Sequence, residues 1–220
     1  MYSLEIHKRF MREALREAVK AADAGEVPTG CVIVRTDKVR GQGVKGLRDS
    51  GVQEVRGSDS EAYPLTPEPL NPLIPSPLNP LTPEPLNPLT PEPLNPLTPQ
   101  IIARAHNQTE LLKDATAHAE ILAITQASAA IGDWRLTGTI LYVTKEPCAM
   151  CAGAIVLSRI PLVVWGFSDP LRGGHSVFSI LNHDGLNHRP EIIPGVLEPD
   201  CREMFQAFFR ERRGECSQLR

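Results

Sequence analysis

The sequence lacks the features of a membrane or secreted protein. No run of apolar residues approaches the ~18 that a membrane-spanning helix needs. The first ten residues carry Glu5, Lys8 and Arg9 and have no apolar core, so we expect no secretory signal there. The five cysteines do not form a disulfide framework in such a chain and favour metal or redox chemistry instead. We therefore expect a cytoplasmic protein with no membrane attachment.

The sequence also has no excess of charge of one sign. It holds 23 basic and 26 acidic residues, and leaving out residues 36–100 leaves 18 of each sign. This balance excludes a uniformly basic nucleic-acid-binding protein, but it is compatible with a local basic patch.

Proline is concentrated in one segment. Of 21 prolines, 14 fall between Pro64 and Pro99, where the octapeptide PLTPEPLN recurs with small variations. Three prolines in eight residues remove backbone donors and exclude a helix or a central strand, so we expect polyproline II structure or disorder over residues 36–100. A docking arm for a proline-recognising partner of unknown identity is one interpretation. A neutral expansion of a surface loop is the favoured one, because loop-closure entropy grows slowly with length.

The remaining 155 residues, 1–35 and 101–220, are about the size of one compact domain. Apolar spacing predicts an amphipathic helix over residues 4–24, with Gly25 as its stop. It also predicts that the insert joins two consecutive strands of a hairpin. From residue 117 helices and strands alternate, which favours an α/β layered fold with parallel neighbouring strands. The expected strands are residues 31–34, 101–105, 140–143 and 162–166, and the expected later helices are 117–130, 147–158 and 201–213.

Three residues can supply a nitrogen and two sulfur ligands to one metal ion: His118, Cys148 and Cys151. Cys148 and Cys151 share a helix face at this spacing, with Pro147 suited to the first helical position and Thr116 to the cap before His118. A structural zinc site normally has four protein ligands, whereas three ligands and an open position are typical of a catalytic zinc that holds a water. A fourth ligand from Cys31, Cys201 or another histidine remains an alternative.

Glu120 follows His118 by two residues and therefore points in a different direction from the same helix start. From there its carboxylate could reach a metal-bound water without binding the metal, and could pass a proton to a leaving amine. The alternative is an ordinary glutamate in a first helical turn, favoured by the helix dipole.

Together, HAE at 118–120 and PCAMC at 147–151 match the H-x-E and P-C-x-x-C signature of zinc-dependent nucleobase deaminases. Longer stretches carry the resemblance further. These stretches are EVPTGCVIV (26–34), DATAHAE (114–120), LYVTKEPCAMCAGAIVLSRI (141–160), VVWGFSDP (163–170) and GLNHRPEI (185–192). With them the chain resembles the bacterial tRNA-specific adenosine deaminases, within the cytidine/deoxycytidylate deaminase superfamily.

The resemblance implies a three-layer α/β fold of the cytidine-deaminase type, with a mixed five-stranded sheet flanked by helices. It implies hydrolytic deamination of adenosine to inosine at the wobble position of a tRNA anticodon, in a homodimer with one zinc per subunit. His118, Cys148 and Cys151 would bind the zinc, and Glu120 would move protons. Asn107 would bond the flipped base, while Asp169, Arg172 and Asn187 would lie near the anticodon loop. Thr29, Ala115 and His175 depart from the residues usual in the family.

Two other functions remain open at this point. The same zinc motif serves deaminases of free cytosine, cytidine or guanine, but the basic segment FFRERR (208–213) favours an RNA substrate over these. A non-catalytic zinc-bearing RNA-binding subunit is less favoured, because such a subunit would lack the shuttle glutamate, and Glu120 is present.

Overall fold

The structure is a computed structural model that describes residues 2–36 and 99–218 of the 220-residue chain, with side chains described up to residue 213. The expected proline-rich insert, residues 36–100, falls almost entirely outside these residues. Thr36 and Gln100, at its two ends, are described: the Thr36 amide donates to the Gly138 carbonyl, and Gln100 begins a strand.

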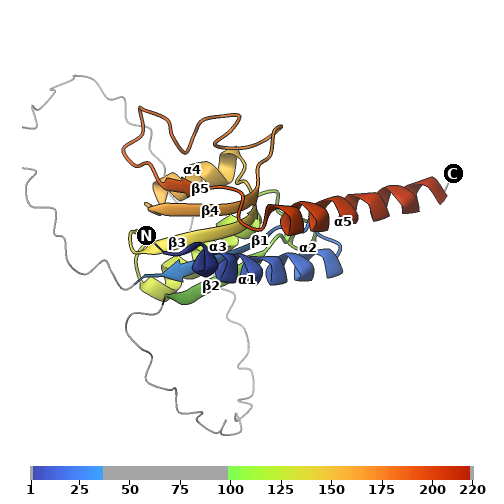
Figure 1. Ribbon diagram of the computed structural model, residues 1–220, viewed down its shortest axis with the longest axis horizontal. Helices are drawn as coiled ribbons and strands as arrows, with labels where there is room; N and C mark the ends of the chain where they lie inside the picture. The colour runs from blue at the N-terminus through green and yellow to red at the C-terminus, as the bar shows by residue number, and fades with distance from the viewer. Residues whose placement is uncertain (1, 37–98, 219–220) are drawn as a thin grey trace, which may run out of the picture. The chain divides into compact units, whose positions relative to one another are not determined.

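A mixed five-stranded sheet organises the described part of the chain (Figure 1). Its strand order is β2-β1-β3-β4-β5. The strands are β1 (Gly30–Arg35), β2 (Gln100–His106), β3 (Thr139–Lys145), β4 (Leu162–Phe167) and β5 (Glu191–Ile193). β1 pairs antiparallel with both β2 and β3, while β3, β4 and β5 are parallel. Arg35 pairs with Gln100, which confirms that the insert joins two neighbouring antiparallel strands.

Helices cover both faces of the sheet and make three layers (Figure 1). The helices are α1 (Leu4–Asp23), α2 (Thr109–Leu112), α3 (Ala119–Ile131), α4 (Ala149–Leu157) and α5 (Glu198–Gln218). α3 and α4 pack on one face through Ala123, Ala127, Ile155 and their neighbours. α1 and α5 pack on the other face through Phe10, Met11 and Phe205. α4 connects the parallel strands β3 and β4, as a crossover between parallel strands requires.

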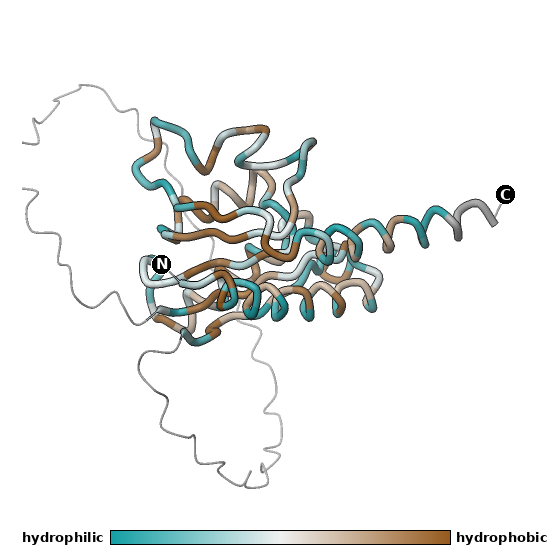
Figure 2. Tube along the Cα trace, viewed as in Figure 1, coloured by the Kyte–Doolittle hydropathy of each residue, from teal (hydrophilic) through white to brown (hydrophobic). Residues whose placement is uncertain are grey.

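Strand alternation explains why one sheet can have two apolar faces. Cys31 and Ile33 of β1 belong to the cluster under α3 and α4, whereas Val32 and Val34 belong to the cluster under α1 and α5. Successive side chains of a strand point to opposite faces, so a strand covered on both sides is apolar throughout. In Figure 2 the central strands are accordingly hydrophobic along their length, while α1 alternates between hydrophobic and hydrophilic residues.

The predicted elements agree with the structure except in detail. The helix over residues 4–24 is α1, and Gly25 ends it in a left-handed conformation with φ +75°, which glycine adopts without strain. α2 and β5 were not predicted from the apolar pattern, because four- and three-residue elements are too short to show a period. The final helix is longer than expected, since it begins at Glu198 and extends to Gln218.

No helix in the described ranges is both long enough and apolar enough to cross a membrane.

Candidate active site

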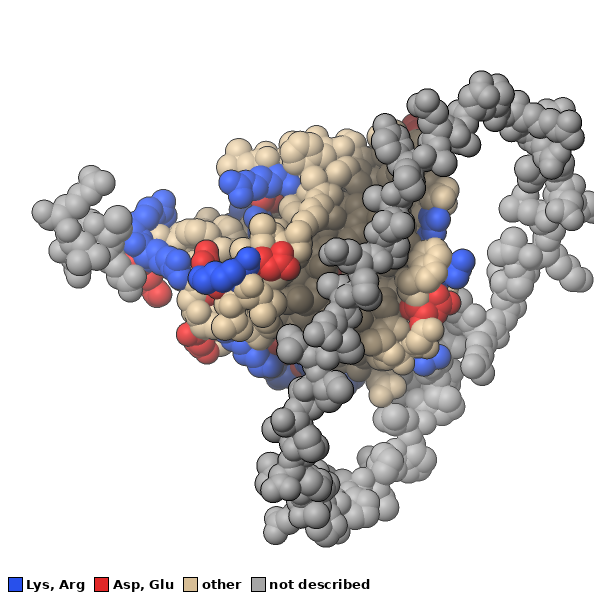
Figure 3. All heavy atoms as spheres, turned by 180° about the vertical axis from the view of Figure 1, so that it is seen from behind, with Lys and Arg blue, Asp and Glu red and all other residues tan. Residues whose placement is uncertain are grey.

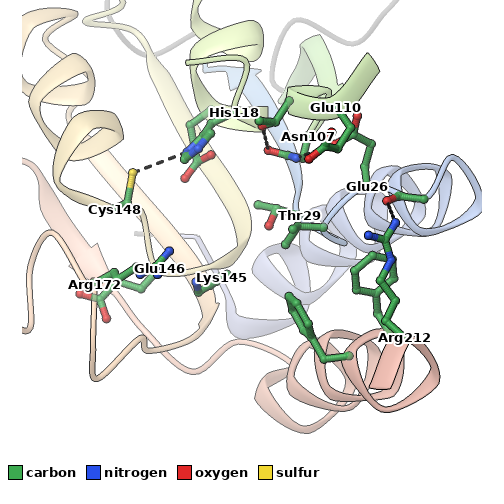
Figure 4. Close-up of a pocket in the computed structure, with 16 residues that line it drawn as sticks. Glu26, Thr29, Asn107, Glu110, His118, Lys145, Glu146, Cys148, Arg172 and Arg212 are labelled. Atoms are coloured by element: carbon green, nitrogen blue, oxygen red, sulfur yellow. Dashed lines mark hydrogen bonds between the residues drawn. The ribbon is translucent and has the colours of Figure 1, made fainter. Parts of the chain in front are cut away.

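A cleft of about 290 Å³ opens at one end of the sheet (Figure 4). β1 begins there at Gly30, while β2 and β3 end there at His106 and Lys145, and the antiparallel register sets these three ends side by side. Residues that follow or precede these ends line the cleft: Glu26, Thr29, Asn107, His118, Glu120, Glu146, Cys148 and Arg172, together with Phe208, Phe209 and Arg212 of α5. Sequence segments more than a hundred residues apart therefore meet in one site.

The three predicted metal ligands lie together on the wall of this cleft. The ligand atoms of His118, Cys148 and Cys151 are all within 4.8 Å of one another. The Nδ1 atom of His118 is 3.6 Å from the Cys148 sulfur and 3.5 Å from the Cys151 sulfur. A nitrogen and a sulfur bound to one tetrahedral zinc at ~2.0 and ~2.3 Å would stand about 3.5 Å apart. The spacing of these donors therefore fits a zinc ion.

Two ligands lie at the starts of two helices, although not in the way that the sequence predicts. His118 is itself the N-cap of α3 and Cys148 the N-cap of α4. The predicted cap Thr116 instead donates its hydroxyl to Asp114, and Pro147 precedes the N-cap of α4, so it is not the first helical residue. Both predictions are wrong because His118 and Cys148 occupy the N-cap positions. Their side chains make no capping hydrogen bond and point toward each other in the ligand cluster instead.

The cluster favours a thiolate on Cys148. A hydrogen bond from Cys151 and another from His118 lower the pKa of Cys148 to about 3, and the N-terminus of α4 adds positive potential. The neighbouring Cys148 sulfur and burial raise the pKa of Cys151. Without a cation the pair therefore carries one negative charge, and a divalent cation would stabilise both thiolates. The chemistry of these donors matches a zinc site with three protein ligands.

The alternative fourth ligands lie elsewhere in the fold. Among the described residues, His118, Cys148 and Cys151 are the one group of His, Cys, Asp or Glu side chains spaced to hold a metal ion. Cys31 is buried in the apolar cluster under α3 and α4, and Cys201 in the cluster on the opposite face of the sheet. Burial raises the pKa of Cys201 to about 12. Within the described part of the chain, the structure favours three ligands and an open position.

Glu120 is buried with 3% of its surface exposed, and it lines the cleft beside the ligand cluster. It is the second residue of α3, so its side chain leaves the helix in a different direction from that of His118. Burial raises the pKa of its carboxyl group. A raised pKa makes the carboxylate a stronger base, which is suited to proton transfer.

Asn107 forms the opposite wall together with Glu26 (Figure 4). The Asn107 Nδ2 atom donates to Glu26 Oε2 at 3.0 Å, and its Oδ1 atom accepts from the Thr109 hydroxyl at 3.2 Å. Glu26 also accepts the Leu111 amide at 2.7 Å and is only 2% exposed. A carboxylate only accepts hydrogen bonds, so the Asn107 nitrogen must face Glu26, and the orientation of the amide is fixed.

The other three predicted substrate-binding residues, Arg172, Asp169 and Asn187, differ in their position relative to the cleft. Arg172 lines the cleft. Asp169 is 8% exposed and pairs with Lys145 at 2.6 Å, while its Oδ1 atom accepts the amides of Leu171 and Arg172. Asn187 is exposed in the segment before β5 and accepts a hydrogen bond from Arg159. The cleft therefore brings together Arg172 and Asn107 but not Asn187.

Two carboxylates of the cleft were not predicted from the sequence, whereas the three residues of α5 belong to the segment FFRERR (208–213), which favours an RNA substrate on sequence grounds. Glu26 and Glu146 are buried carboxylates, and Phe208, Phe209 and Arg212 come from α5, where Arg212 donates to the Gly25 carbonyl. Glu26 and Glu146 lie inside the segments that carry the family resemblance, but a lone glutamate gives no local signal of burial. Basic side chains, with acidic ones among them, gather toward the end of α5 in Figure 3.

Known proteins that resemble this chain in sequence and in structure are deaminases. The model of the MafB19-like deaminase family matches residues 98–213. The tRNA-specific adenosine deaminase of Bacillus subtilis is 37% identical over 206 residues, which cover 93% of this chain and 89% of that protein. A solved structure from work on A-to-I editing by tRNA:A34 deaminases at the wobble position of transfer RNA is 29% identical. It has a TM-score of 0.58 and covers 89% of this chain and 98% of its own.

A more distant structure shares the fold alone. The guanine deaminase from Nitrosomonas europaea is 15% identical, with a TM-score of 0.50, and covers 90% of this chain and 81% of its own. The three-layer fold, a sheet with helices on both faces, is thus common to deaminases that act on different bases. The identity of the substrate must come from the residues that surround the ligand cluster.

Proposed function

The chain belongs to the tRNA-specific adenosine deaminase family, and on this premise we propose how its residues carry out the family's reaction. The reaction is hydrolytic deamination of adenosine at the wobble position of a tRNA anticodon, in which the oxygen of a water molecule replaces the amino group, inosine remains in the tRNA and ammonia is released. The observation that carries the assignment is the cleft itself. His118, Cys148, Glu120 and Asn107 line it, and Cys151 lies beside His118 and Cys148 in the ligand cluster.

We propose that His118, Cys148 and Cys151 hold one zinc ion per subunit. The support is their nitrogen and sulfur donors, their spacing of 3.5 and 3.6 Å, and the lowered pKa of Cys148. Bound there, zinc would supply Lewis-acid activation of the attacking water.

Glu120 moves the protons in this proposal. Its carboxylate takes a proton from the water that attacks the base and delivers it to the departing amino group. Its burial supports the role, because burial raises the pKa of the carboxyl group and so makes the carboxylate a stronger proton acceptor. Its place on the helix turn beside His118 gives it reach to the reacting atoms without membership of the ligand cluster.

Asn107 binds the adenine base that has been turned out of the anticodon loop. Glu26 accepts one of the two hydrogens of Asn107 Nδ2, and the other remains to donate to an acceptor on the base. Arg172 contacts the phosphate backbone of the loop through its guanidinium, and Phe209, which is partly exposed in the lining of the cleft, offers a face on which a neighbouring base can stack. Asp169 and Asn187 are proposed to lie near the same loop, Asp169 by orienting the chain around Arg172.

The test compares an anticodon stem-loop of arginine tRNA with free nucleosides and bases. Purified protein is incubated with the stem-loop, adenosine, cytidine and guanine, and the products are separated by chromatography. We expect inosine at the first anticodon position and far weaker action on free adenosine, because phosphate contacts add affinity that a nucleoside cannot supply. Efficient turnover of guanine or cytidine with none on the stem-loop would establish the free-base alternative instead.

We also propose that the enzyme is a homodimer. Exposed apolar side chains lie on α4 and on the segment after β4: Leu157 is 71% exposed, Leu171 79% and Phe178 52%. Contact with a second subunit would remove these apolar side chains from water. Light scattering on the eluting protein should give twice the 24.1 kDa chain mass. A tRNA substrate and the free cysteines of the described residues favour a cytoplasmic location.

A further inference from the structure

Glu146 is a buried carboxylate that the proposed reaction does not use. It lies between Lys145, the last residue of β3, and the metal-ligand segment that starts at Pro147. Its side chain is 3% exposed. Among the described residues no cation is paired with it, so its charge is balanced by hydrogen-bond donors alone. Burial of a carboxylate costs free energy unless hydrogen-bond donors satisfy its lone pairs. The donors around Glu146 therefore indicate which part of the structure it stabilises.

All the donors of Glu146 come from one loop, residues 169–178, which we call the Arg172 loop. The Oε2 atom accepts the Asp169 amide and the Ser176 hydroxyl, each at 2.9 Å. The Oε1 atom accepts the Ser176 amide at 2.7 Å and the His175 amide at 3.1 Å. The carboxylate therefore holds both ends of the Arg172 loop, before and after the arginine that lines the cleft.

The loop is shaped to lie directly on this carboxylate. A Cβ atom added at Gly173 would lie 2.4 Å from Glu146 Oε1, and one at Gly174 would lie 2.9 Å from the carbonyl oxygens of Pro147 and Cys148. The Gly174 amide donates to the Pro147 carbonyl at 2.7 Å, and Gly173 forms a β-bridge with Cys148. Two glycines thus allow the loop to approach the backbone of the ligand segment.

We propose that Glu146 is a positioning residue for RNA binding, which fixes the Arg172 loop against the ligand segment so that Arg172 enters the cleft. This inference rests on the proposed RNA substrate. Glu146 does not contact the ligand cluster through any hydrogen bond in the described structure, and its four acceptor contacts all lead to the loop. Loss of these contacts should release the arginine and leave the metal and the proton path in place.

The test is Glu146→Gln, which keeps the size of the side chain but replaces one acceptor oxygen by a donor that faces N–H and O–H donors. Hydrogen exchange of the free protein should show at least tenfold faster exchange in peptides covering the Arg172 loop. Zinc content should stay at one per chain. The KM for the stem-loop should rise about tenfold, while kcat at saturating RNA stays within about threefold. Glu5→Gln, which removes only a surface pair with Lys8 on α1, is the matched control and should change none of these.

A double-mutant cycle identifies the route of the effect. If Glu146 acts through the arginine, Glu146→Gln added to Arg172→Ala should raise KM by less than about twofold beyond Arg172→Ala alone. Should Glu146→Gln fail to fold, Ser176→Ala is the second variant: it removes two hydroxyl hydrogen bonds, one to Glu146 Oε2 and one to the Asp169 carbonyl, keeps the charge of Glu146, and should raise KM about threefold.

Two results would overturn the proposal. One is unchanged exchange in the Arg172 loop with unchanged KM. The other is a fall in zinc content and kcat with unchanged KM, which would make Glu146 a support of Cys148 instead. If wild-type protein fails to deaminate the stem-loop, the proposed function fails, and the hydrogen-exchange and zinc results still report separately on the link between Glu146 and the loop.

Discussion

The ligand cluster and the opposite wall of the cleft are built in different ways. The cluster uses two helix starts, and each of its residues lies within three positions of another functional residue or of a helix boundary. The opposite wall uses the turn after α1, the end of β2 and the middle turns of α5, and it depends on the buried pair of Glu26 and Asn107. Under the proposed function, residues in short local segments carry out the chemistry, and contacts between distant segments recognise the substrate.

This difference predicts how the two regions respond to substitution. A change in the cluster should abolish the reaction and leave the remaining fold intact. A change in the opposite wall should reduce kcat/KM for the substrate by a modest factor, because several weak contacts together bind the substrate. The four experiments below test this contrast, from the largest expected effect to the smallest.

Cys148→Ala should have the largest effect. Removal of one of three ligands should abolish stoichiometric zinc binding and bring deamination below detection. Metal content by mass spectrometry and inosine formation from the stem-loop measure the two losses. Cys201→Ala is the matched control, because Cys201 is buried on the other face of the sheet; it should lower Tm by a few degrees and keep zinc and activity. Retention of zinc by Cys148→Ala would show that the ligand set is wrong.

Glu120→Gln should separate metal binding from proton transfer. The amide has nearly the shape of the carboxylate but cannot move protons, so kcat should fall by about 10³-fold while zinc content stays at one per chain. Single-turnover kinetics, with the enzyme in saturating excess over the stem-loop, measure the chemical step directly. A rate near that of the wild type would contradict the assigned role of Glu120.

Glu26→Gln should act on recognition and not on chemistry. The glutamine amide keeps one acceptor oxygen, so it can accept from the Asn107 side chain or from the Leu111 amide but not from both, and the orientation of the Asn107 amide is no longer fixed. We expect kcat/KM for the stem-loop to fall about tenfold, or about 1.4 kcal/mol, with zinc unchanged. Glu13→Gln, which weakens a surface pair with Arg104, serves as the control. A loss as large as that of Glu120→Gln would place Glu26 in the chemical step.

Deletion of the proline-rich insert should have the smallest effect. Arg35 and Gln100 are paired across the β1–β2 hairpin, so a short Asn-Gly turn after Thr36 can close it. Replacing residues 37–99 in this way should keep zinc content and stem-loop deamination within about threefold of the wild type. Normal zinc content with lost tRNA affinity would show that the insert is a docking or RNA-binding arm.

Local pattern was sufficient for the long elements and for the ligand cluster. α1, α3, β3 and β4 have enough residues to show an apolar period, and the histidine and cysteines lie in a recognisable spacing. The caps were predicted less well. Thr116 and Pro147 have the residue types that usually begin helices, but the ligand side chains of His118 and Cys148 occupy the N-cap positions instead.

The sequence by itself determined the longer helices and strands, the residues proposed as metal ligands and the separation of Glu120 from them, because these depend on residues a few positions apart. Tertiary structure alone decided that Glu26 would orient Asn107, 81 residues away in the chain, and that Glu146 would hold the Arg172 loop. A glutamate becomes a buried, fully satisfied acceptor only when the sheet register brings distant N–H groups to it. That register is set by the paired strands together, and no local segment encodes it.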